Sequence, residues 1–478
     1  MLTLETLPSF TVGLPLDDLP KTFKDAIQVS RKLGLEYLWI DALCIIQRQE
    51  GSEDWLIESS HMRSVYGGTH INLAASSATN VFEGLFLKPT HHNGGFRARV
   101  TAGDQCRIQD FHSRSTYQES STETQLATRA WAFQEKLLAA RTIHFGDQGV
   151  FWECRSCVKS EFLPDGFRRL GSHLVCPEDK AWRWSDIVSH YSAARLTYSS
   201  DRLPALSGIA ARQHEVTGDQ YLAGMWRKHL SFQLAWSCTP DQRSKRPPWR
   251  APTWSWASVD GQTRIMDYHD GKGHREALKT YVCVLDVWTV PSGPDPFGAV
   301  NGGALSIGCS ALIPARLVGL YEPLLRIPGS EIESVLVDTE TRPFPVTLDC
   351  LEDELFRSDD FIYLLPLFGG RSGSALKRRM KDSEDSEQGE GEGEGWIKQL
   401  IISGVVLQRL GNISGHFRRV GYFWFANYKF SRGDDDDYHY DSFIRVIEEV
   451  GTSTAEAQCS RVLSGSDSPD SRYVLTIE

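Results

Sequence analysis

Two acidic side chains, Asp41 and Glu58, stand in segments that otherwise have the composition of a protein core. Asp41 interrupts a nearly unbroken apolar run over residues 37–43, close to its carboxyl end. Such a run predicts a strand that is buried on both faces of a parallel sheet. Ligands of open α/β sheets bind at the carboxyl ends of strands, so Asp41 is a candidate site residue. The alternative is an Asp that accepts hydrogen bonds from loop amides and caps the next turn.

Glu58 lies on the apolar stripe of a predicted helix. A helix over residues 53–66 would place five side chains on one face: Trp55, Glu58, Met62, Val65 and Tyr66. We expect this face to be buried. A carboxylate there must be paired, hydrogen-bonded or raised in pKa, and all three are properties of functional sites. The alternative is a Glu that bonds to backbone amides or to an arginine of a neighbouring element.

The elements that must position these two carboxylates alternate between helix and strand. Residues 18–33 read as a helix with Pro20 in its first turn and Gly34 at its end. The predicted strand and the Glu58 helix follow, and a second apolar run covers residues 70–75. This alternation is typical of an α/β sheet.

A further helix and a hairpin are predicted downstream of this unit. Trp131, Gln134, Glu135 and Leu138 share one helical face, and residues 142–153 read as two strands joined by a turn. Gln134 and Glu135 are polar groups on a mostly packed face. They either orient Asp41 or Glu58, or bond across a helix interface, and the general need to satisfy buried polar groups favours the interface.

The segment around Asp41 and Glu58 resembles the heterokaryon-incompatibility (HET) domain of filamentous fungi. The resemblance rests on a Leu-Trp-Ile-Asp-Ala-Leu-Cys core, an Asp-Trp-x-x-Glu step and a Met-x-x-x-Tyr ending. Beside Asp41 and Glu58, the residues of these motifs and of a later block support the candidate site: Trp39, Cys44, Gln47, Trp55, Tyr66, Gln134 and Glu135.

Further blocks extend the resemblance over most of residues 14–260. They include residues 128–135, 151–154, 201–208 and 221–226, and the Trp254-Ser-Trp256 pair. The family's first strand, with a Ser-Tyr-x-Trp-Gly motif, has no counterpart before Pro20. Either this sequence starts too late or the protein has lost this strand. The resemblance implies a TIR-like, flavodoxin-like HET region, here without its first strand, followed by a helical segment and a mainly β carboxyl-terminal region.

The resemblance implies a role in nonself recognition and programmed cell death. We expect an interaction and signalling module that self-associates or binds a protein partner. The alternative is a TIR-like NAD-cleaving hydrolase, in which Glu58 is the essential carboxylate and Asp41 assists. No cofactor is firmly implied; NAD would be a substrate, and the chain has no Gly-rich phosphate loop.

Composition bounds these expectations. The 478 residues are 41% hydrophobic and 24% charged, which is typical of soluble globular proteins, and the net charge of -11 argues against nucleic-acid binding. No apolar stretch is long enough to span a membrane, and we expect a cytoplasmic protein with reduced thiols. A zinc site at Cys154, Cys157, His173 and Cys176 has a suitable ligand count but rests on one CxxC, so we expect no metal.

Three regions are predicted along the chain. Residues 14–160 form the HET domain, residues 161–260 its helical extension, and residues 261–478 a β-rich region. Apolar, β-branched runs predict strands near residues 282–290, 304–318, 361–368, 399–410 and 418–425. Residues 371–395 carry dense charge and a Gly-Glu repeat, which predicts a disordered acidic loop.

Overall fold

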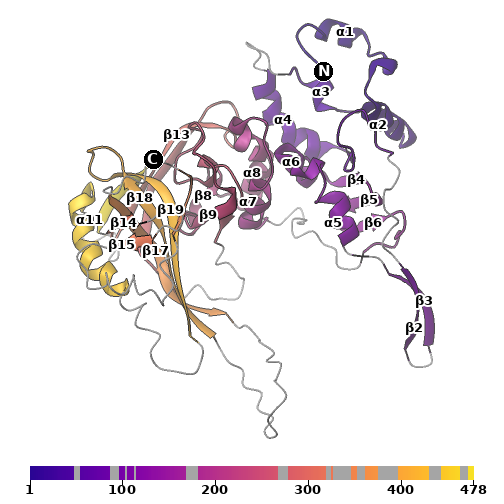
Figure 1. Ribbon diagram of the computed structural model, residues 1–478. Helices are drawn as coiled ribbons and strands as arrows, with labels where there is room; N and C mark the ends of the chain where they lie inside the picture. Colours follow the sequence, from indigo (N-terminus) through magenta and orange to yellow (C-terminus); the bar gives the residue numbers. More distant parts are fainter. Residues whose placement is uncertain are drawn as a thin grey trace. The chain divides into compact units, whose positions relative to one another are not determined.

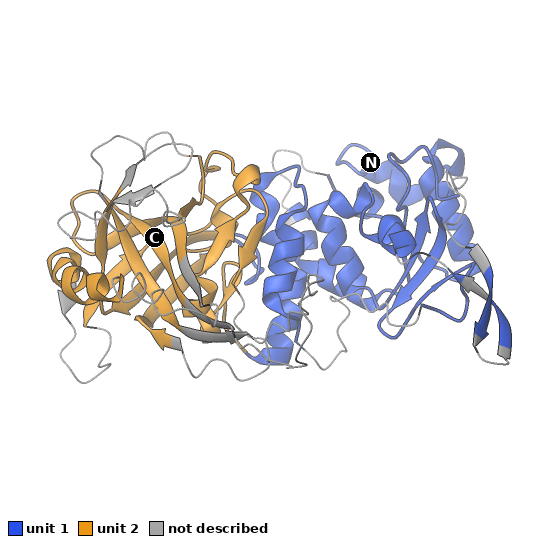
Figure 2. Cartoon of the chain, turned by 60° about the horizontal axis from the view of Figure 1, so that its bottom comes forward, with its two compact units in different colours: residues 1–218, 291–299 blue, residues 219–290, 300–478 orange. Residues whose placement is uncertain are grey.

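The computed structural model describes residues 1–47, 54–86, 96–102, 105–111, 113, 115–167, 181–266, 278–318, 324–326, 346–351, 361–374, 397–429, 443–462 and 472–478. The chain forms two compact units (Figure 2). Unit 1 comprises residues 1–218 and 291–299, and unit 2 comprises residues 219–290 and 300–478. The three regions predicted from the sequence, with boundaries at residues 160 and 260, stay a prediction.

Unit 1 contains helices and short strands (Figure 1). Its described helices are α1 (Leu7–Val12), α2 (Lys21–Lys32), α3 (Asp41–Cys44), α4 (Asp54–Gly68), α5 (Ser115–Ser121), α6 (Ala130–Leu138), α7 (Trp184–Ser192) and α8 (Pro204–Thr217). Its described strands are β1 (Asn72–Ala74), β2 (Phe96–Ala102), β3 (Gln105–Phe111), β4 (Arg141–Gly146), β5 (Gly149–Cys154) and β6 (Val158–Ser160). The predicted helices near residues 18–33, 53–66 and 131–138 are confirmed.

The central sheet of unit 1 has the strand order β1-β4-β5-β6 within the described residues. β1 pairs with β4 in parallel, whereas β4, β5 and β6 pair antiparallel. The predicted hairpin over residues 142–153 is confirmed. Gly146 pairs with Gly149 across a two-residue turn, and Gly149 has a positive φ of 122°, which a residue with a Cβ rarely adopts. The sheet is therefore mixed.

The strand predicted over residues 37–43 is wrong. Residues 35–40 have no regular structure, and Asp41 begins the one-turn helix α3. A strand needs neighbours that satisfy its amides, and β1, the next element of the predicted sheet, pairs with β4 instead. The apolar side chains of the run are consequently exposed: Tyr37 has 89% of its surface in solvent and Leu38 36%.

Helices α4, α6 and α8 pack on one another in unit 1. Gly208 of α8 makes the closest approach to α6. Its amide donates to Oε1 of Gln134 at 2.7 Å, and a Cβ built on Gly208 would lie 2.9 Å from both that oxygen and Leu138 Cδ1. A larger residue would therefore separate α6 from α8, so the glycine fixes the position of the helix that carries Glu135.

Unit 2 is mainly β, as predicted. Its described strands are β7 (Tyr221–Leu222), β8 (Met225–Trp226), β9 (Trp236–Cys238), β10 (Thr263–Ile265), β11 (Leu278–Thr280), β12 (Val282–Pro291), β13 (Val300–Cys309), β14 (Ile313–Val318), β15 (Leu324–Arg326), β16 (Val346–Leu348), β17 (Phe361–Ser374), β18 (Ile397–Arg409), β19 (His416–Lys429), β20 (Arg461–Val462) and β21 (Tyr473–Ile477). The helices α9 (Leu230–Gln233) and α11 (Thr452–Gln458) accompany them.

In the described part of unit 2, eleven strands form one sheet, most of it in the order β12-β13-β21-β19-β18-β17-β14-β15. Four of the five predicted regions each correspond to one strand, β12, β17, β18 and β19, whereas residues 304–318 are divided between two strands, β13 and β14. The predicted acidic loop was to begin at residue 371, but residues 371–374 belong to β17 and pair with β18; its remainder, residues 375–395, lies outside the described residues. The helical character predicted for residues 161–260 is only partly correct: α7, α8 and α9 are helices, but residues 221–226 form the hairpin β7–β8.

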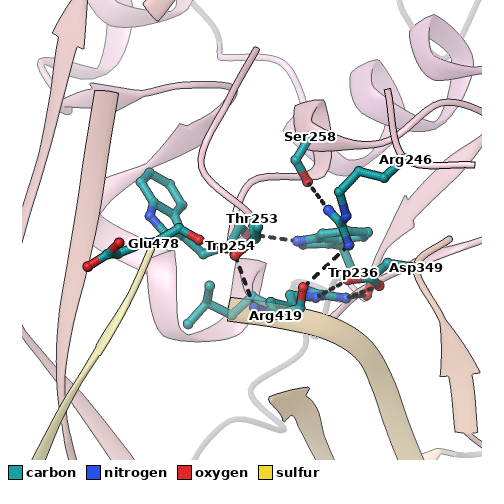
Figure 3. A network of polar contacts seen from close by, with 9 residues as sticks. Trp236, Arg246, Thr253, Trp254, Ser258, Asp349, Arg419 and Glu478 are labelled. Carbon is teal, nitrogen blue, oxygen red and sulfur yellow. Dashed lines mark hydrogen bonds and ion pairs between the residues drawn. The ribbon is translucent and has the colours of Figure 1, made fainter. Parts of the chain in front are cut away.

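A buried arginine is the centre of a network of polar contacts in unit 2 (Figure 3). Arg419 is 0% exposed and pairs with Asp349, with its Nε 3.0 Å from Oδ2 and its second terminal nitrogen 3.1 Å from Oδ1. The guanidinium also donates to the Leu234 carbonyl at 2.6 Å and lies 3.4 Å over the Trp236 ring. Such bidentate, fully bonded geometry is what a buried ion pair requires.

Within the described residues, no helix is both long and apolar enough to span a bilayer, and no three His, Cys, Asp or Glu side chains gather as metal ligands. Two of the four zinc-ligand candidates, His173 and Cys176, lie outside the described residues.

Candidate functional site

Asp41 begins α3, and its local bonds are those of a turn residue. Its Oδ1 accepts the amide of Ala42 at 2.7 Å, and its carbonyl accepts both the amide of Ile45 and the side chain of Gln47. Gln47 Nε2 also donates to the Ile45 carbonyl, so this side chain closes the α3 turn. Asp41 thus accepts a local backbone amide at the start of a turn, as the alternative interpretation of this residue predicts. Asp41 nevertheless remains exposed.

Tyr66 and Glu135 lie near enough to Asp41 for its charge to raise the pKa of both. Tyr66 sits in the last turn of α4 and Glu135 near the middle of α6, and the Tyr66 hydroxyl is close enough to the Glu135 carboxyl group to lower its pKa. The negative charge of Asp41 acts on both groups. Glu135 and Tyr66 are partly buried, whereas Asp41 is exposed. We call these three residues, with Arg129, the Asp41–Glu135 site.

Arg129 and Trp39 complete the surroundings of this site. Arg129 precedes the first residue of α6, where pairing of residues 128–130 with Arg195 fixes the backbone, and its charge acts on both Glu135 and Tyr66. Trp39 meets Tyr66 edge to face, with ring centroids 5.5 Å apart. The site therefore combines two carboxyl groups, a phenol, a guanidinium and an indole.

Burial and a neighbouring charge set the protonation of Glu135. Loss of solvent and the Asp41 carboxylate raise the Glu135 pKa to about 7, against smaller opposite effects of Arg129 and the Tyr66 hydrogen bond. The pKa of Tyr66 is raised above its usual value by the same burial and by the charges of Glu135 and Asp41. Near neutral pH, Glu135 can therefore donate or accept a proton, while Tyr66 keeps its own.

Glu58 does not belong to this cluster, and its predicted burial is wrong. Its side chain is 31% exposed, and Oε1 lies 3.7 Å from His61 Nδ1 on the next turn of α4. Glu58 and Tyr66 are eight residues apart on that helix, about 12 Å along its axis. The apolar stripe of α4 is buried at Met62, which is 5% exposed, while Glu58 lies at its edge.

The other supporting residues predicted from the sequence make packing contacts or helix–helix hydrogen bonds, or are exposed. Trp55 packs edge to face on Trp131 of α6, with centroids 5.3 Å apart, and Cys44 is an exposed free thiol. Gln134 is 1% exposed and bonds to α8 through Gly208, so its interpretation as an interface residue is confirmed. Glu135 also contacts a neighbouring helix, through Tyr66 of α4, and in addition feels the charge of Asp41.

Sequence reasoning missed a second polar cluster of unit 1, which we call the paired cluster. In it, Glu153 Oε2 lies 2.8 Å from His144 Nε2 and 3.3 Å from Lys136 Nζ. Ser76 Oγ lies 3.3 Å from His144 Nδ1. His144 and Glu153 occupy buried positions of the hairpin β4–β5, so polar residues at inward positions of the predicted strands were the signal that could have found them.

In the paired cluster, Glu153 is ionised near neutral pH. Burial alone would raise the pKa of Glu153, but Lys136 and His144 outweigh it and lower the pKa to about 2. Burial lowers the pKa of His144, so its ring is neutral at pH 7. The cluster therefore resembles an internal ion pair with its hydrogen bonds made, whereas the Asp41–Glu135 site retains a group that titrates near neutrality.

The Asp41–Glu135 site is the better candidate for chemistry or ligand binding. Two carboxyl groups in different surroundings, one protonated near neutral pH, are the usual acid and base of reactions at glycosidic bonds. The exposed side chains of Asp41 and Arg129 leave the site open to solvent.

Comparisons with known proteins locate the site within a family. Residues 5–135 match the family model described as "Heterokaryon incompatibility protein (HET)", and this range contains Asp41, Tyr66, Arg129 and Glu135. Comparisons with curated proteins and with solved structures found no match. The TIR-like part of the fold expectation and the resemblance beyond residue 135 thus stay predictions. The family expected from the sequence is confirmed: the chain carries a heterokaryon-incompatibility (HET) domain, matched over residues 5–135.

Proposed function

We propose that this protein acts in heterokaryon incompatibility, as a cytoplasmic signalling module in nonself recognition and programmed cell death. The match of residues 5–135 to the HET family carries the proposal. An exposed apolar segment supports the module interpretation. Tyr37 is 89% exposed, and Leu33 and Leu38 are 48% and 36% exposed, next to the Asp41–Glu135 site. Clustered apolar side chains on a surface are typical of contacts with another protein. Here the contact would be with a protein partner or a second copy of the chain.

The first test removes the apolar segment. Expression of the full chain is expected to reduce cell viability, and the double variant Tyr37→Ser, Leu38→Ser is expected to restore it and to abolish co-precipitation of two differently tagged copies or of a partner. Phe82→Ser is the matched control, because Phe82 is 73% exposed in the same unit but outside the segment. Equal toxicity and equal association of the double variant and the control would contradict the module proposal.

A specific observation favours a second candidate, hydrolysis of NAD at its N-glycosidic bond. The Asp41–Glu135 site offers a carboxylate to face an oxocarbenium-like transition state, and a second carboxyl group that holds a proton near pH 7 to bond a ribose hydroxyl. The sequence alone favours Glu58 as the essential carboxylate of this alternative. The surroundings of Glu135 now support Glu135 and Asp41 for that role, while Glu58 remains a candidate.

NAD consumption by the purified chain separates these assignments. An enzyme should lose at least about 100-fold in rate on replacement of an essential carboxylate, the size typical of a lost acid–base group. Glu135→Gln, Asp41→Asn and Glu58→Gln are compared with Glu123→Gln, an exposed carboxylate of the same unit. Toxicity with NAD unchanged in every variant would reject the hydrolase and leave the signalling module.

A further inference from the structure

The turn between β5 and β6 brings two thiols together. Cys154 ends β5, Cys157 immediately precedes β6, and their Sγ atoms are 3.6 Å apart. The Cys154 amide donates to the Cys157 carbonyl at 3.0 Å, so the two residues face each other across a closed hairpin. Both side chains are partly exposed. A directly opposed pair on a tight hairpin brings the thiols close enough for rotation of the side chains to reach bonding distance.

The turn also stabilises a negative charge on one of the sulfurs. The amides of Ser156 and Cys157 and the hydroxyl of Ser156 are directed at Cys154 Sγ, with the Ser156 Oγ at 3.6 Å. These hydrogen bonds outweigh burial and lower the pKa of the Cys154 thiol to about 6. Burial and the Cys154 sulfur raise the pKa of Cys157. One sulfur is thus prepared to attack and its neighbour to remain a thiol, which is the division of roles in dithiol redox sites.

We propose that Cys154 and Cys157 form a thiol–disulfide redox site that reacts with low-molecular-weight disulfides of the glutathione type. The Cys154 thiolate attacks one sulfur of the small disulfide, forms a mixed disulfide and releases one small thiolate. The Cys157 thiol then loses its proton and attacks Cys154 Sγ, which forms the Cys154–Cys157 disulfide and releases the second small thiolate. Two protein thiols are oxidised, one small disulfide is reduced to two thiols, and the reaction reverses in excess thiol.

The first experiment measures this equilibrium in the full chain. The protein is equilibrated with glutathione and glutathione disulfide at a series of ratios, and free thiols are trapped by alkylation and located by peptide mass spectrometry. We expect a peptide-mapped Cys154–Cys157 disulfide that appears as the buffer becomes more oxidising and disappears on return to reducing buffer. Cys44 and Cys106, both exposed, serve as internal reference thiols and are expected to show no such intramolecular bond.

Single substitutions distinguish the attacking sulfur from the resolving one. Cys157→Ser is expected to accumulate a mixed disulfide with glutathione at Cys154, whereas Cys154→Ser is expected to lose the reaction. Alkylation of Cys154 in the unmodified chain should level off above about pH 7, while an ordinary thiol continues to gain reactivity up to about pH 9. Far-UV circular dichroism and the unfolding temperature check that both variants fold.

Three results would overturn the proposal. The first is a Cys154 and Cys157 pair that stays reduced at every ratio while Cys44 becomes glutathionylated. The second is protection of both thiols that a chelator removes, which would assign the pair to a metal ion. The third is a mixed disulfide that accumulates equally at Cys157 in Cys154→Ser, which would show that the hairpin does not select the attacking sulfur.

Discussion

Glu135 and Glu153 are two desolvated glutamates of unit 1 whose pKa values move in opposite directions. Burial is the largest effect on both, yet the pKa of Glu135 rises to about 7 and that of Glu153 falls to about 2. The difference lies in their neighbours. Glu135 faces a second carboxylate, Asp41, while Glu153 is held by Lys136 and His144. Burial alone therefore does not mark a reactive carboxyl group; the sign of the adjacent charge decides.

One helix supplies both environments. Glu135 and Lys136 are consecutive residues of α6 and point about 100° apart around its axis. Glu135 faces α3 and the end of α4, and Lys136 faces the hairpin β4–β5. A small rotation of α6 would alter both clusters at once. The packing of Gly208 on Gln134 and Leu138, which prevents that rotation, thus maintains the difference between the two glutamates.

Among the substitutions considered, we expect the largest loss of stability on breaking the buried ion pair of Arg419 and Asp349 in unit 2 (Figure 3). Arg419→Met leaves the Asp349 carboxylate buried without its cation, and we expect the free energy of unfolding to fall by about 3–5 kcal/mol. Urea unfolding followed by circular dichroism measures it. Arg418→Met, the adjacent and partly exposed arginine, is the control and should cost about 1 kcal/mol or less. Equal losses would show that the pair is not what stabilises this core.

The two glutamates should give opposite pH dependences of stability. The Glu135 pKa is raised, so the folded state binds the extra proton, and the free energy of unfolding should fall by about 3 kcal/mol as pH rises from about 4.5 through 7. The Glu153 pKa is lowered, so its contribution is present above about 4.5 and is lost, again about 3 kcal/mol, as pH falls toward 2.

Unfolding curves of Glu135→Gln and Glu153→Gln across pH 2–8 check these two slopes. Relative to the unmodified chain, Glu135→Gln should remove the decline in unfolding free energy between pH 4.5 and 7. It should leave the loss of stability below pH 4.5 unchanged. Glu153→Gln should remove only the loss of unfolding free energy between pH 4.5 and pH 2. A common slope in both variants would mean that neighbouring charges do not distinguish the two carboxyl groups.

A smaller effect is expected from Lys136→Met, which converts the Glu153 environment toward that of Glu135. The Lys136 side chain is 24% exposed, so the expected loss of about 2 kcal/mol at pH 7 is below that for a fully buried pair. The Glu153 pKa should rise, as carbon-13 NMR titration of the side-chain carboxyl would detect. A pKa that stays near 2 would assign the stabilisation to His144 alone.

The smallest effect is expected from Tyr66→Phe. The Tyr66 hydrogen bond lowers the Glu135 pKa against the larger effects of burial and Asp41, so its removal should raise that pKa, with a change in stability of about 1 kcal/mol. The same NMR titration measures it, with Tyr37→Phe as the exposed control. A lower Glu135 pKa in Tyr66→Phe would show that the phenol does not donate to this carboxyl group.

Elements with local stop and turn residues could be predicted from the sequence. Gly34, with φ of 71°, follows the end of α2, and the Gly146 to Gly149 turn fixes the β4–β5 hairpin because its geometry depends on adjacent residues. Several longer β strands of unit 2, among them β12, β17, β18 and β19, followed from their apolar runs, whereas the hairpin β7–β8 lies in a stretch expected to be helical. The candidate site was found only in part: Asp41, Tyr66 and Glu135 were named, but the essential role was given to Glu58, whose helical stripe suggested burial that the packing does not provide.

The sequence by itself determined the family, the helices and turns, and the acidic residues from which a site can be built, because these depend on neighbours within a few positions of the chain. The tertiary structure decided which of those residues meet. Residues 37–43 do not become a strand, because no strand in the described part of the chain pairs with them. Glu135 lies where the Asp41 charge acts on it, whereas Glu58 pairs with His61 on its own helix. The partner of a strand and the burial of a carboxyl group both depend on segments that are distant in the sequence, so no local sequence pattern encodes them.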